Sequence, residues 1–129
     1  MNEEKKKVLP CIALCEGYIH PRVLTGGDPA RAKKIADKLD NAVCLAQNRE
    51  YHSYSGTWKG VPVTVTSHGV GEGGAVIGFE SLCRAGAKVI IRVGTCGGMQ
   101  KEITEGSLVV VKAACREDGV TEKMLPLSY

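Results

Sequence analysis

The sequence is poor in aromatic residues, with one Phe, one Trp and four Tyr in 129 residues. We therefore expect a core built mainly from Val, Ile, Leu and Ala rather than from stacked rings. No apolar run approaches the length that spans a bilayer, so no membrane partner is expected. The net charge of +3 is too small to indicate a nucleic-acid partner, and we interpret Lys5, Lys6 and Lys7 as a solvated tail.

The six cysteines form no CxxC pair, and no histidines accompany them at the spacing of a zinc site. We expect reduced thiols, no metal centre and a cytoplasmic location. A short apolar stretch follows the lysines, but it contains Pro10 and lacks a good cleavage site, so we do not expect a secretory signal.

Strand-like and helix-like segments alternate along the chain, which predicts one α/β domain. β-rich or apolar runs predict strands over residues 22–25, 43–47, 54–59, 61–67, 88–93 and 107–115. Helical periodicity predicts a helix over residues 30–39, with Asp28 as its N-cap and Pro29 at the first helical position. A second helix is predicted between Gly74 and Gly86. Its shared apolar face consists of Val76, Phe79, Leu82 and Cys83.

Two turn signals, Ser55-Gly56 and Lys59-Gly60, divide the β-rich stretch and predict strands joined partly as a hairpin. The last predicted strand contains an apolar run at residues 108–111, as expected of a strand buried on both faces. Only residues 116–129 follow it, too few to cover it with another helix and strand. We therefore expect a truncated domain.

Two glycine-rich segments carry arginines that could bind an anion. In residues 26–31, two glycines precede a helix N-terminus and Arg31 lies in its first turn, a combination suited to phosphate. In residues 92–98, Arg92 and Thr95 begin a loop at the carboxyl end of a predicted strand, where ligands of open α/β sheets bind. Each motif alone has a plain alternative, because arginines also pair with surface carboxylates and glycines also serve tight turns. The glycines of residues 69–73 have the wrong spacing for a dinucleotide site, so we reject a nicotinamide enzyme.

Four motifs, in this order and spacing, resemble successive signatures of the purine nucleoside and uridine phosphorylase family, especially its protozoan members. They are Gly27-Asp28-Pro29-x-Arg31, Asn48-Arg49-Glu50-Tyr51, Ser67-His68-Gly69-Val70-Gly71 and Arg92-Val93-Gly94-Thr95-Cys96-Gly97. The resemblance implies a three-layer α/β/α nucleoside phosphorylase-like fold with a central mixed β-sheet. Residues 1–21 would form an N-terminal segment and residues 22–129 the N-terminal portion of the domain, with the C-terminal half absent.

The resemblance also implies a phosphate site and an assembly. Gly27, Arg31, Arg92 and Thr95 would bind phosphate, with Arg49 donated by a neighbouring subunit, so a homodimer or a larger homo-oligomer built from dimers is expected. Cys96 and Gly97 would line the substrate pocket, although a small buried filler is an alternative for Cys96. Inorganic phosphate is the co-substrate and no cofactor is implied.

For Glu50, which resembles a cation ligand of some uridine phosphorylases, we favour a solvated or salt-bridged role, because Gly74 replaces a possible hydroxyl ligand there. Cys11 stands where the family carries a histidine that reaches the neighbour's ribose, and a thiol cannot reproduce that hydrogen bond. We interpret His20, His52 and His68 as structural, and we assign no catalytic residue.

These observations favour a nucleoside phosphorylase, which cleaves the N-glycosidic bond reversibly with phosphate to give a free base and ribose 1-phosphate, with uridine preferred over purine nucleosides. The alternative is a truncated, catalytically incomplete chain that binds phosphate or assembles with a partner. A nucleosidase that uses water is less compatible, because water needs no pair of arginines such as Arg31 and Arg92. Since the base- and ribose-reading half is absent, we expect little turnover from this chain alone.

Overall fold

The computed structural model describes residues 7–125 of the chain. The chain divides into two units, Met1–Gly94 and Thr95–Tyr129, and each is described by itself. Lys5 and Lys6 of the predicted tail lie outside the described residues, as do residues 126–129. The predicted segment boundary after residue 21 stays a prediction.

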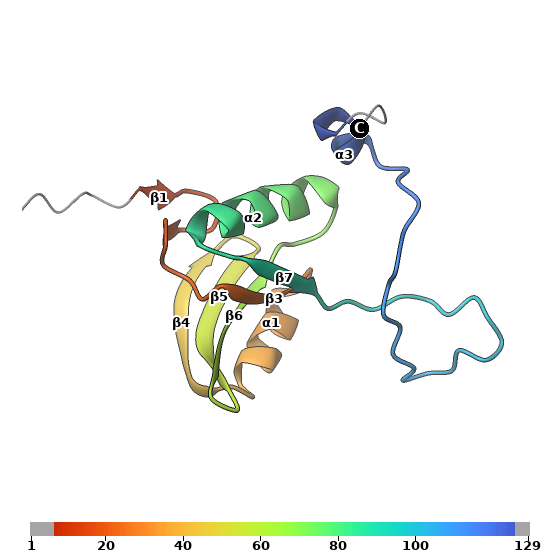
Figure 1. The fold of residues 1–129 in the computed structure, drawn as a ribbon, viewed down its shortest axis with the longest axis horizontal. Coiled ribbons are helices and arrows are strands. Elements are labelled where there is room, and N and C mark those ends of the chain that lie inside the picture. Colours follow the sequence, from red (N-terminus) through yellow and green to blue (C-terminus); the bar gives the residue numbers. More distant parts are fainter. Residues whose placement is uncertain (1–6, 126–129) are drawn as a thin grey trace, which may run out of the picture. The chain divides into compact units, whose positions relative to one another are not determined.

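One five-stranded mixed sheet forms the centre of the first unit, in the order β4-β5-β6-β3-β7 (Figure 1). Its strands are β3 (Arg22–Gly26), β4 (Asp40–Asn48), β5 (Tyr51–Trp58), β6 (Val61–Ser67) and β7 (Val89–Arg92). β4, β5 and β6 pair antiparallel, whereas β6, β3 and β7 pair parallel. The predicted α/β class with a central mixed sheet is confirmed.

Helix α1 (Pro29–Ala36) covers one face of the sheet and begins as predicted (Figure 1). The Asp28 side chain accepts a hydrogen bond of 2.8 Å from the amide of Ala30, and Pro29 lies at the first helical position. The helix ends earlier than predicted, because the amide of Leu39 bonds back to the carbonyl of Ala36 in a tighter final turn. Its buried alanines pack in a cluster with side chains of β5 and β6; the cluster contains Ala32, Ala36, Tyr54, Val63 and Val65.

Helix α2 (Glu72–Ala85) covers the opposite face and ends at Gly86, as predicted (Figure 1). Gly86 has a φ of 120°, a conformation that favours glycine at a helix end. Leu82 is buried on the sheet, but Cys83 is exposed, so its predicted place on the apolar face is wrong. Buried positions of α2 fall at residues 78, 82 and 85, and Cys83 is turned about 100° away from Leu82.

Two short strands near the N-terminus, β1 (Val8–Leu9) and β2 (Leu14–Cys15), were not predicted. They pair antiparallel, and Leu9, Ile12 and Leu14 join the buried cluster on the α2 face. Two-residue strands carry too few positions to show an alternating pattern.

The turn signals gave one correct and one wrong prediction. Lys59-Gly60 does connect β5 to β6, with positive φ at both residues, as two-residue hairpin turns require. Ser55-Gly56 instead lies inside β5. A Cβ at Gly56 would come within 2.8 Å of the Leu39 Cβ, so this glycine permits a close approach of the chain after α1.

In the second unit, residues 107–115 form no strand, contrary to the prediction. The side chains of Leu108 and Val110 are 97% and 95% exposed. A strand needs a neighbour for its backbone hydrogen bonds, and no segment within residues 7–125 pairs with this one. One short helix, α3 (Gly119–Met124), was missed; the carboxylate of Asp118 caps its amides.

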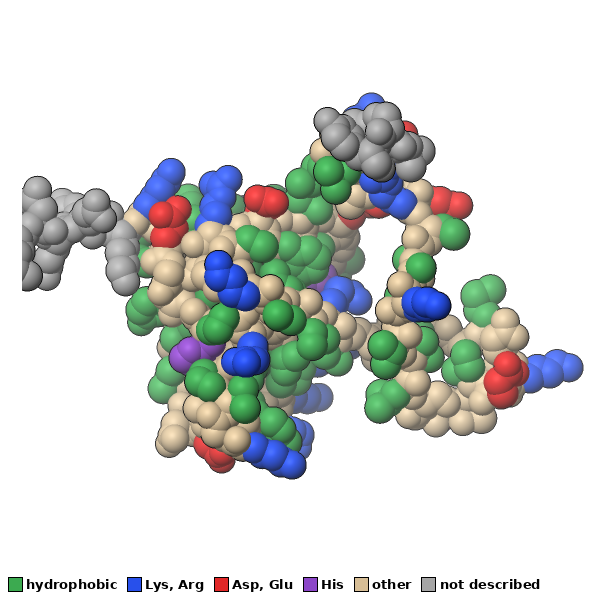
Figure 2. Space-filling model, viewed as in Figure 1, with side chains coloured by type: hydrophobic (Ala, Val, Ile, Leu, Met, Phe, Trp, Pro, Cys, Tyr) green, Lys and Arg blue, Asp and Glu red, His purple; other side chains and the backbone are tan. Residues whose placement is uncertain are grey.

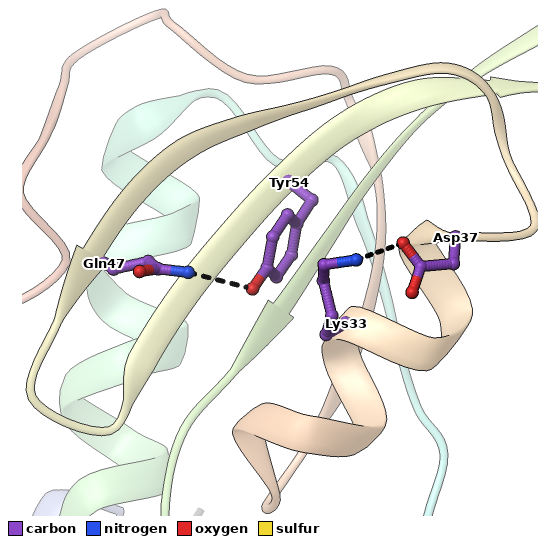
Figure 3. A network of polar contacts seen from close by, with 4 residues as sticks. All are labelled: Lys33, Asp37, Gln47 and Tyr54. Atoms are coloured by element: carbon purple, nitrogen blue, oxygen red, sulfur yellow. Dashed lines mark hydrogen bonds and ion pairs between the residues drawn. The ribbon is translucent and has the colours of Figure 1, made fainter.

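Charged side chains are dispersed on one face of the first unit. On the face drawn in Figure 2, Lys and Arg side chains are spread over several elements among apolar side chains. Figure 3 shows one ion pair on α1, between Lys33 and Asp37, beside a 3.2 Å hydrogen bond from Gln47 Nε2 to the Tyr54 hydroxyl. None of the helices within residues 7–125 is long and apolar enough to cross a membrane.

Candidate functional site

The carboxyl ends of the three parallel strands lie together at one edge of the sheet. Gly26 of β3 is in register with Ser67 of β6, and Thr25 is in register with Arg92 of β7. The amide of His68 donates to the Gly26 carbonyl at 2.9 Å, and the amide of Val93 donates to the Thr25 carbonyl at 2.7 Å. The loops that follow β3, β6 and β7 therefore begin side by side at this edge.

This edge is a point where connections leave the sheet in opposite directions. After β3 the chain enters α1 on one face, and after the adjacent β6 it enters α2 on the other face (Figure 1). In open α/β sheets, ligands bind outside the carboxyl ends of the strands at such a point.

Glycines allow the three loops to approach one another. A Cβ at Gly26 would lie 3.0 Å from the Val93 carbonyl oxygen, and a Cβ at Gly27 would lie 3.0 Å from the Gly69 carbonyl oxygen. Both contacts are tighter than ordinary van der Waals packing, so a side chain at either position would push the loops apart.

Arg31 lies in the first turn of α1 and is half-buried. Its Cδ is 3.9 Å from the position of a Cβ at Gly26, so the stem of this arginine runs back toward the end of β3. The Asp28 carboxylate occupies the amide of Ala30, which leaves the guanidinium of Arg31 as the cationic group of this turn.

Arg92 ends β7 and contacts a histidine of the neighbouring loop. Its Nε donates to Nε2 of His68 at 3.1 Å. His68 is 3% exposed, and its ring meets the ring of Phe79 on α2 edge to face at 5.6 Å. Burial, and then the positive charge of Arg92, lower the pKa of His68 below 6.5, so the imidazole is neutral at physiological pH.

The contact between His68 and Arg92 went unpredicted, because His68 was interpreted as structural. Its position directly after a β-rich run ending at Ser67 was the available signal, since residues that follow parallel strands collect at the ligand edge. The pairing with Arg92 could not be read from the sequence, because β3 separates β6 from β7 in the sheet.

The turn from β4 to β5 lies at the same edge. Arg49 is exposed at this turn and has a φ of 53°. The Ser67 hydroxyl donates to the Glu50 carbonyl at 2.6 Å, which ties the turn to the end of β6. The Arg49 side chain forms no ion pair within the described part of this chain, and its use by a neighbouring subunit stays a prediction.

Glu50 packs against the loop that follows β6. Its Cγ lies 2.6 Å from the position of a Cβ at Gly69, and the hydroxyl of Tyr51 donates to the Gly74 carbonyl at 3.0 Å. No group of three His, Cys, Asp or Glu side chains that could hold a metal ion occurs within residues 7–125.

Thr95, Cys96 and Gly97 lie at the start of the second unit, and all three are exposed. Their roles in binding phosphate and substrate therefore stay predictions. Cys96 is free and exposed, so the alternative of a small buried filler is not supported by this structure.

Comparisons with known proteins agree with the motifs. A model of the phosphorylase superfamily matches residues 21–127. A purine nucleoside phosphorylase of Plasmodium falciparum is 46% identical over 115 residues, covering 88% of this chain and 47% of that protein. A uridine phosphorylase of Thermococcus kodakarensis is 40% identical over 118 residues, covering 92% of this chain and 43% of that protein.

Among solved structures, purine nucleoside phosphorylase from Toxoplasma gondii in complex with immucillin-H matches with a TM-score of 0.91 and 39% identity. The match covers 99% of this chain and 52% of that one. The chain thus spans about half the length of the relatives that it matches.

Proposed function

The chain belongs to the phosphorylase superfamily, among purine nucleoside and uridine phosphorylases, and from this premise we propose that it supplies the phosphate-binding half of a nucleoside phosphorylase. The reaction is the reversible cleavage of a nucleoside's N-glycosidic bond by inorganic phosphate. The observation that carries the proposal is the meeting of three parallel strand ends at one edge, with Arg92 ending one strand and Arg31 folding back toward another.

The proposed phosphate site consists of Gly27, Arg31, Arg92 and Thr95. Two guanidinium groups suit this anion, because each planar fork can donate two hydrogen bonds to phosphate oxygens. Arg49 of a second copy would complete the site, and Cys96 and Gly97 would line the nucleoside pocket. The assembly is therefore proposed as a homodimer or a larger homo-oligomer, located in the cytoplasm.

In the proposed reaction, the bond from the anomeric carbon to the base nitrogen breaks, and its electron pair leaves with the base, which takes up a proton. A phosphate oxygen forms the new bond to the anomeric carbon, giving ribose 1-phosphate. Arg31 and Arg92 would hold the phosphate in line beside the cationic sugar, so that positioning and electrostatics supply the rate enhancement. No cofactor takes part in these steps.

The substrate stays open between two classes. The motifs favoured uridine, whereas the relative with 46% identity is a purine nucleoside phosphorylase. A second candidate function is phosphate binding or assembly without catalysis. Assays with uridine, inosine and adenosine, each with and without phosphate, distinguish these functions. Turnover that requires phosphate supports the enzyme, and phosphate-dependent stabilisation without turnover supports the second candidate.

Replacing Arg31 by Ala tests the phosphate site. We expect the phosphate Kd to rise about tenfold to a hundredfold, because a hydrogen bond to a charged group contributes about 1.5–3 kcal/mol. The measurement is the thermal shift and the heat of binding on adding phosphate. Lys34→Ala, which removes an exposed cation from the same helix, is the matched control and should bind phosphate normally. Equal phosphate affinity in both variants would contradict the assignment of Arg31.

A further inference from the structure

We propose that His68 is a positioning residue that fixes the guanidinium of Arg92 for phosphate, and that it does so only while its imidazole is neutral. This inference rests on the proposed function, because it assigns Arg92 to the anion. His68 has no role among the site residues predicted from the family resemblance.

The hydrogen bond between the two side chains determines the tautomer of His68. Arg92 Nε carries a hydrogen and can only donate, so His68 Nε2, 3.1 Å away, must offer its lone pair. The single ring proton of the neutral imidazole is therefore on Nδ1. A protonated ring would turn two donors toward each other and place two positive charges side by side.

Packing fixes the ring of His68 with Nε2 in position to accept from Arg92. The Phe79 ring lies edge to face with it at 5.6 Å, and the loop backbone is fixed by the bond from the His68 amide to Gly26. At Gly78 of α2, a Cβ would lie 3.3 Å from the His68 Cβ, so the helix approaches the histidine closely. The acceptor atom is thus rigid, whereas Arg92 is exposed and would otherwise sample many rotamers.

The hydrogen bond to His68 leaves the Nη1 and Nη2 groups of Arg92 for phosphate. With Nε bonded to His68, the end of the guanidinium formed by Nη1 and Nη2 can still donate to an anion. A guanidinium held in one orientation loses less conformational entropy when it binds phosphate, which raises affinity.

Charged and titratable neighbours of His68 come from two elements. Burial lowers the pKa of His68 most, and the positive charge of Arg92 of β7 lowers it further. Glu50 and Tyr51, from the turn between β4 and β5 and the start of β5, lie against the same loop at Gly69 and Gly74. Nδ1 of His68 has no hydrogen-bond partner within the described range 7–125, and the backbone of His68 and Gly69 favours a charged ring less than burial and Arg92 oppose it.

Three variants of the full chain test the inference through phosphate binding. In His68→Gln, the amide oxygen can replace Nε2 as an acceptor without titrating, so we expect phosphate affinity near that of the original chain at pH 7.5. In His68→Leu, which offers no acceptor, we expect the phosphate Kd to rise about tenfold. His20→Gln is the matched control, because within residues 7–125 His20 hydrogen-bonds through its backbone amide, to the Thr64 hydroxyl, and not through its ring.

The pH dependence separates positioning from a merely structural role. Between pH 7.5 and pH 5, phosphate affinity of the original chain should fall more steeply than that of His68→Gln, because only the imidazole can be protonated and release Arg92. Parallel pH profiles of the two proteins would overturn the proposal.

A phosphate-free readout keeps this inference distinct from the proposed function. The ¹⁵N shifts of His68 should report a proton on Nδ1, and the Arg92 Nε–H resonance should be protected in the original chain and in His68→Gln but not in His68→Leu. A proton on Nε2 at neutral pH would overturn the inference whatever phosphate does. If these signals appear but the original chain binds no phosphate, the proposed function is wrong. The positioning role of His68 is then also wrong, and only the hydrogen bond between His68 and Arg92 is supported.

Discussion

At the scale of single residues, two neighbours determine where the guanidinium of Arg92 can lie. Nε of Arg92 donates to His68. A Cβ at Gly94 would lie only 2.5 Å from Nη1 of Arg92, so the absence of a side chain there leaves room for this nitrogen. The atom in the way is the end of a flexible side chain, so a substitution at Gly94 would move Arg92 rather than the fold.

Gly94→Ala should therefore weaken phosphate binding with little effect on stability. We expect the phosphate Kd to rise about tenfold, while the free energy of unfolding changes by no more than about 0.5 kcal/mol. Calorimetry with phosphate and urea unfolding measure the two quantities. A drop in stability without a change in phosphate affinity would show that Gly94 serves the backbone instead.

The lowered pKa of His68 also predicts how the free energy of unfolding depends on pH. Its folded pKa is below 6.5, so between that pKa and 6.5 the unfolded chain binds a proton that the folded chain does not. The free energy of unfolding should fall as pH drops through this window and should be unaffected by His68 above it. Urea unfolding at several pH values measures the slope, and the slope should be smaller in His68→Gln. Identical slopes would place the titrating group elsewhere.

Local chemistry explains which residues could be predicted. The cap at Asp28 and the proline at position 29 act within one turn, so the sequence alone identified them. The bond from Arg92 to His68 joins residues that are 24 positions apart in the sequence. Arg92 ends β7 and His68 directly follows β6, and these two strands are not adjacent in the sheet. Such a pairing depends on strand order, which residue types do not specify.

At the scale of elements, a segment was predictable when its partners lie nearby in the chain. β6 and the C-terminal end of α2 agree with the sequence pattern, although α2 begins two residues before Gly74. β5 and β6 meet through the predicted turn at Lys59-Gly60. Residues 107–115 have a strand's composition but no pairing partner within the described chain. Apolar content shows that a segment is suited to a sheet, and the ladder itself requires a neighbour.

A substitution at Gly56 tests the close contact between β5 and the chain that follows α1. Gly56→Ala places a Cβ 2.8 Å from Leu39 Cβ and 3.0 Å from the Asp40 carbonyl oxygen, so we expect a loss of about 1–3 kcal/mol in the free energy of unfolding. Gly73→Ala is the matched control, because nothing lies within 4 Å of a Cβ there and alanine favours the helix. Urea unfolding of both variants measures the difference, and equal stabilities would show that the chain after α1 can move away.

At the scale of the whole molecule, the chain exposes apolar side chains that its own described residues do not cover. Leu108, Val109, Val110 and Val111 are all exposed in the second unit. A run of this composition with free backbone groups is a template for pairing with another chain. We therefore expect the isolated chain to self-associate through residues 108–111.

Val110→Lys should reduce that association. Its side chain is 95% exposed, so a charge there should leave the free energy of unfolding within about 0.5 kcal/mol while opposing strand pairing. Light scattering over a concentration series measures the effect. Met99→Lys, at a residue that is 96% exposed but outside the run, is the control for added charge. The same loss of association in both variants would mean that net charge, and not residues 108–111, controls self-association.

The turn at Lys59-Gly60 has a practical use that follows from the strand register. It joins the end of β5 to the start of β6, whereas the proposed phosphate site begins where β6 ends, after seven residues of strand. At about 3.3 Å per residue, the turn is roughly 20 Å from that edge. A surface-immobilisation tag inserted at this exposed turn would anchor the protein while leaving the strand ends clear.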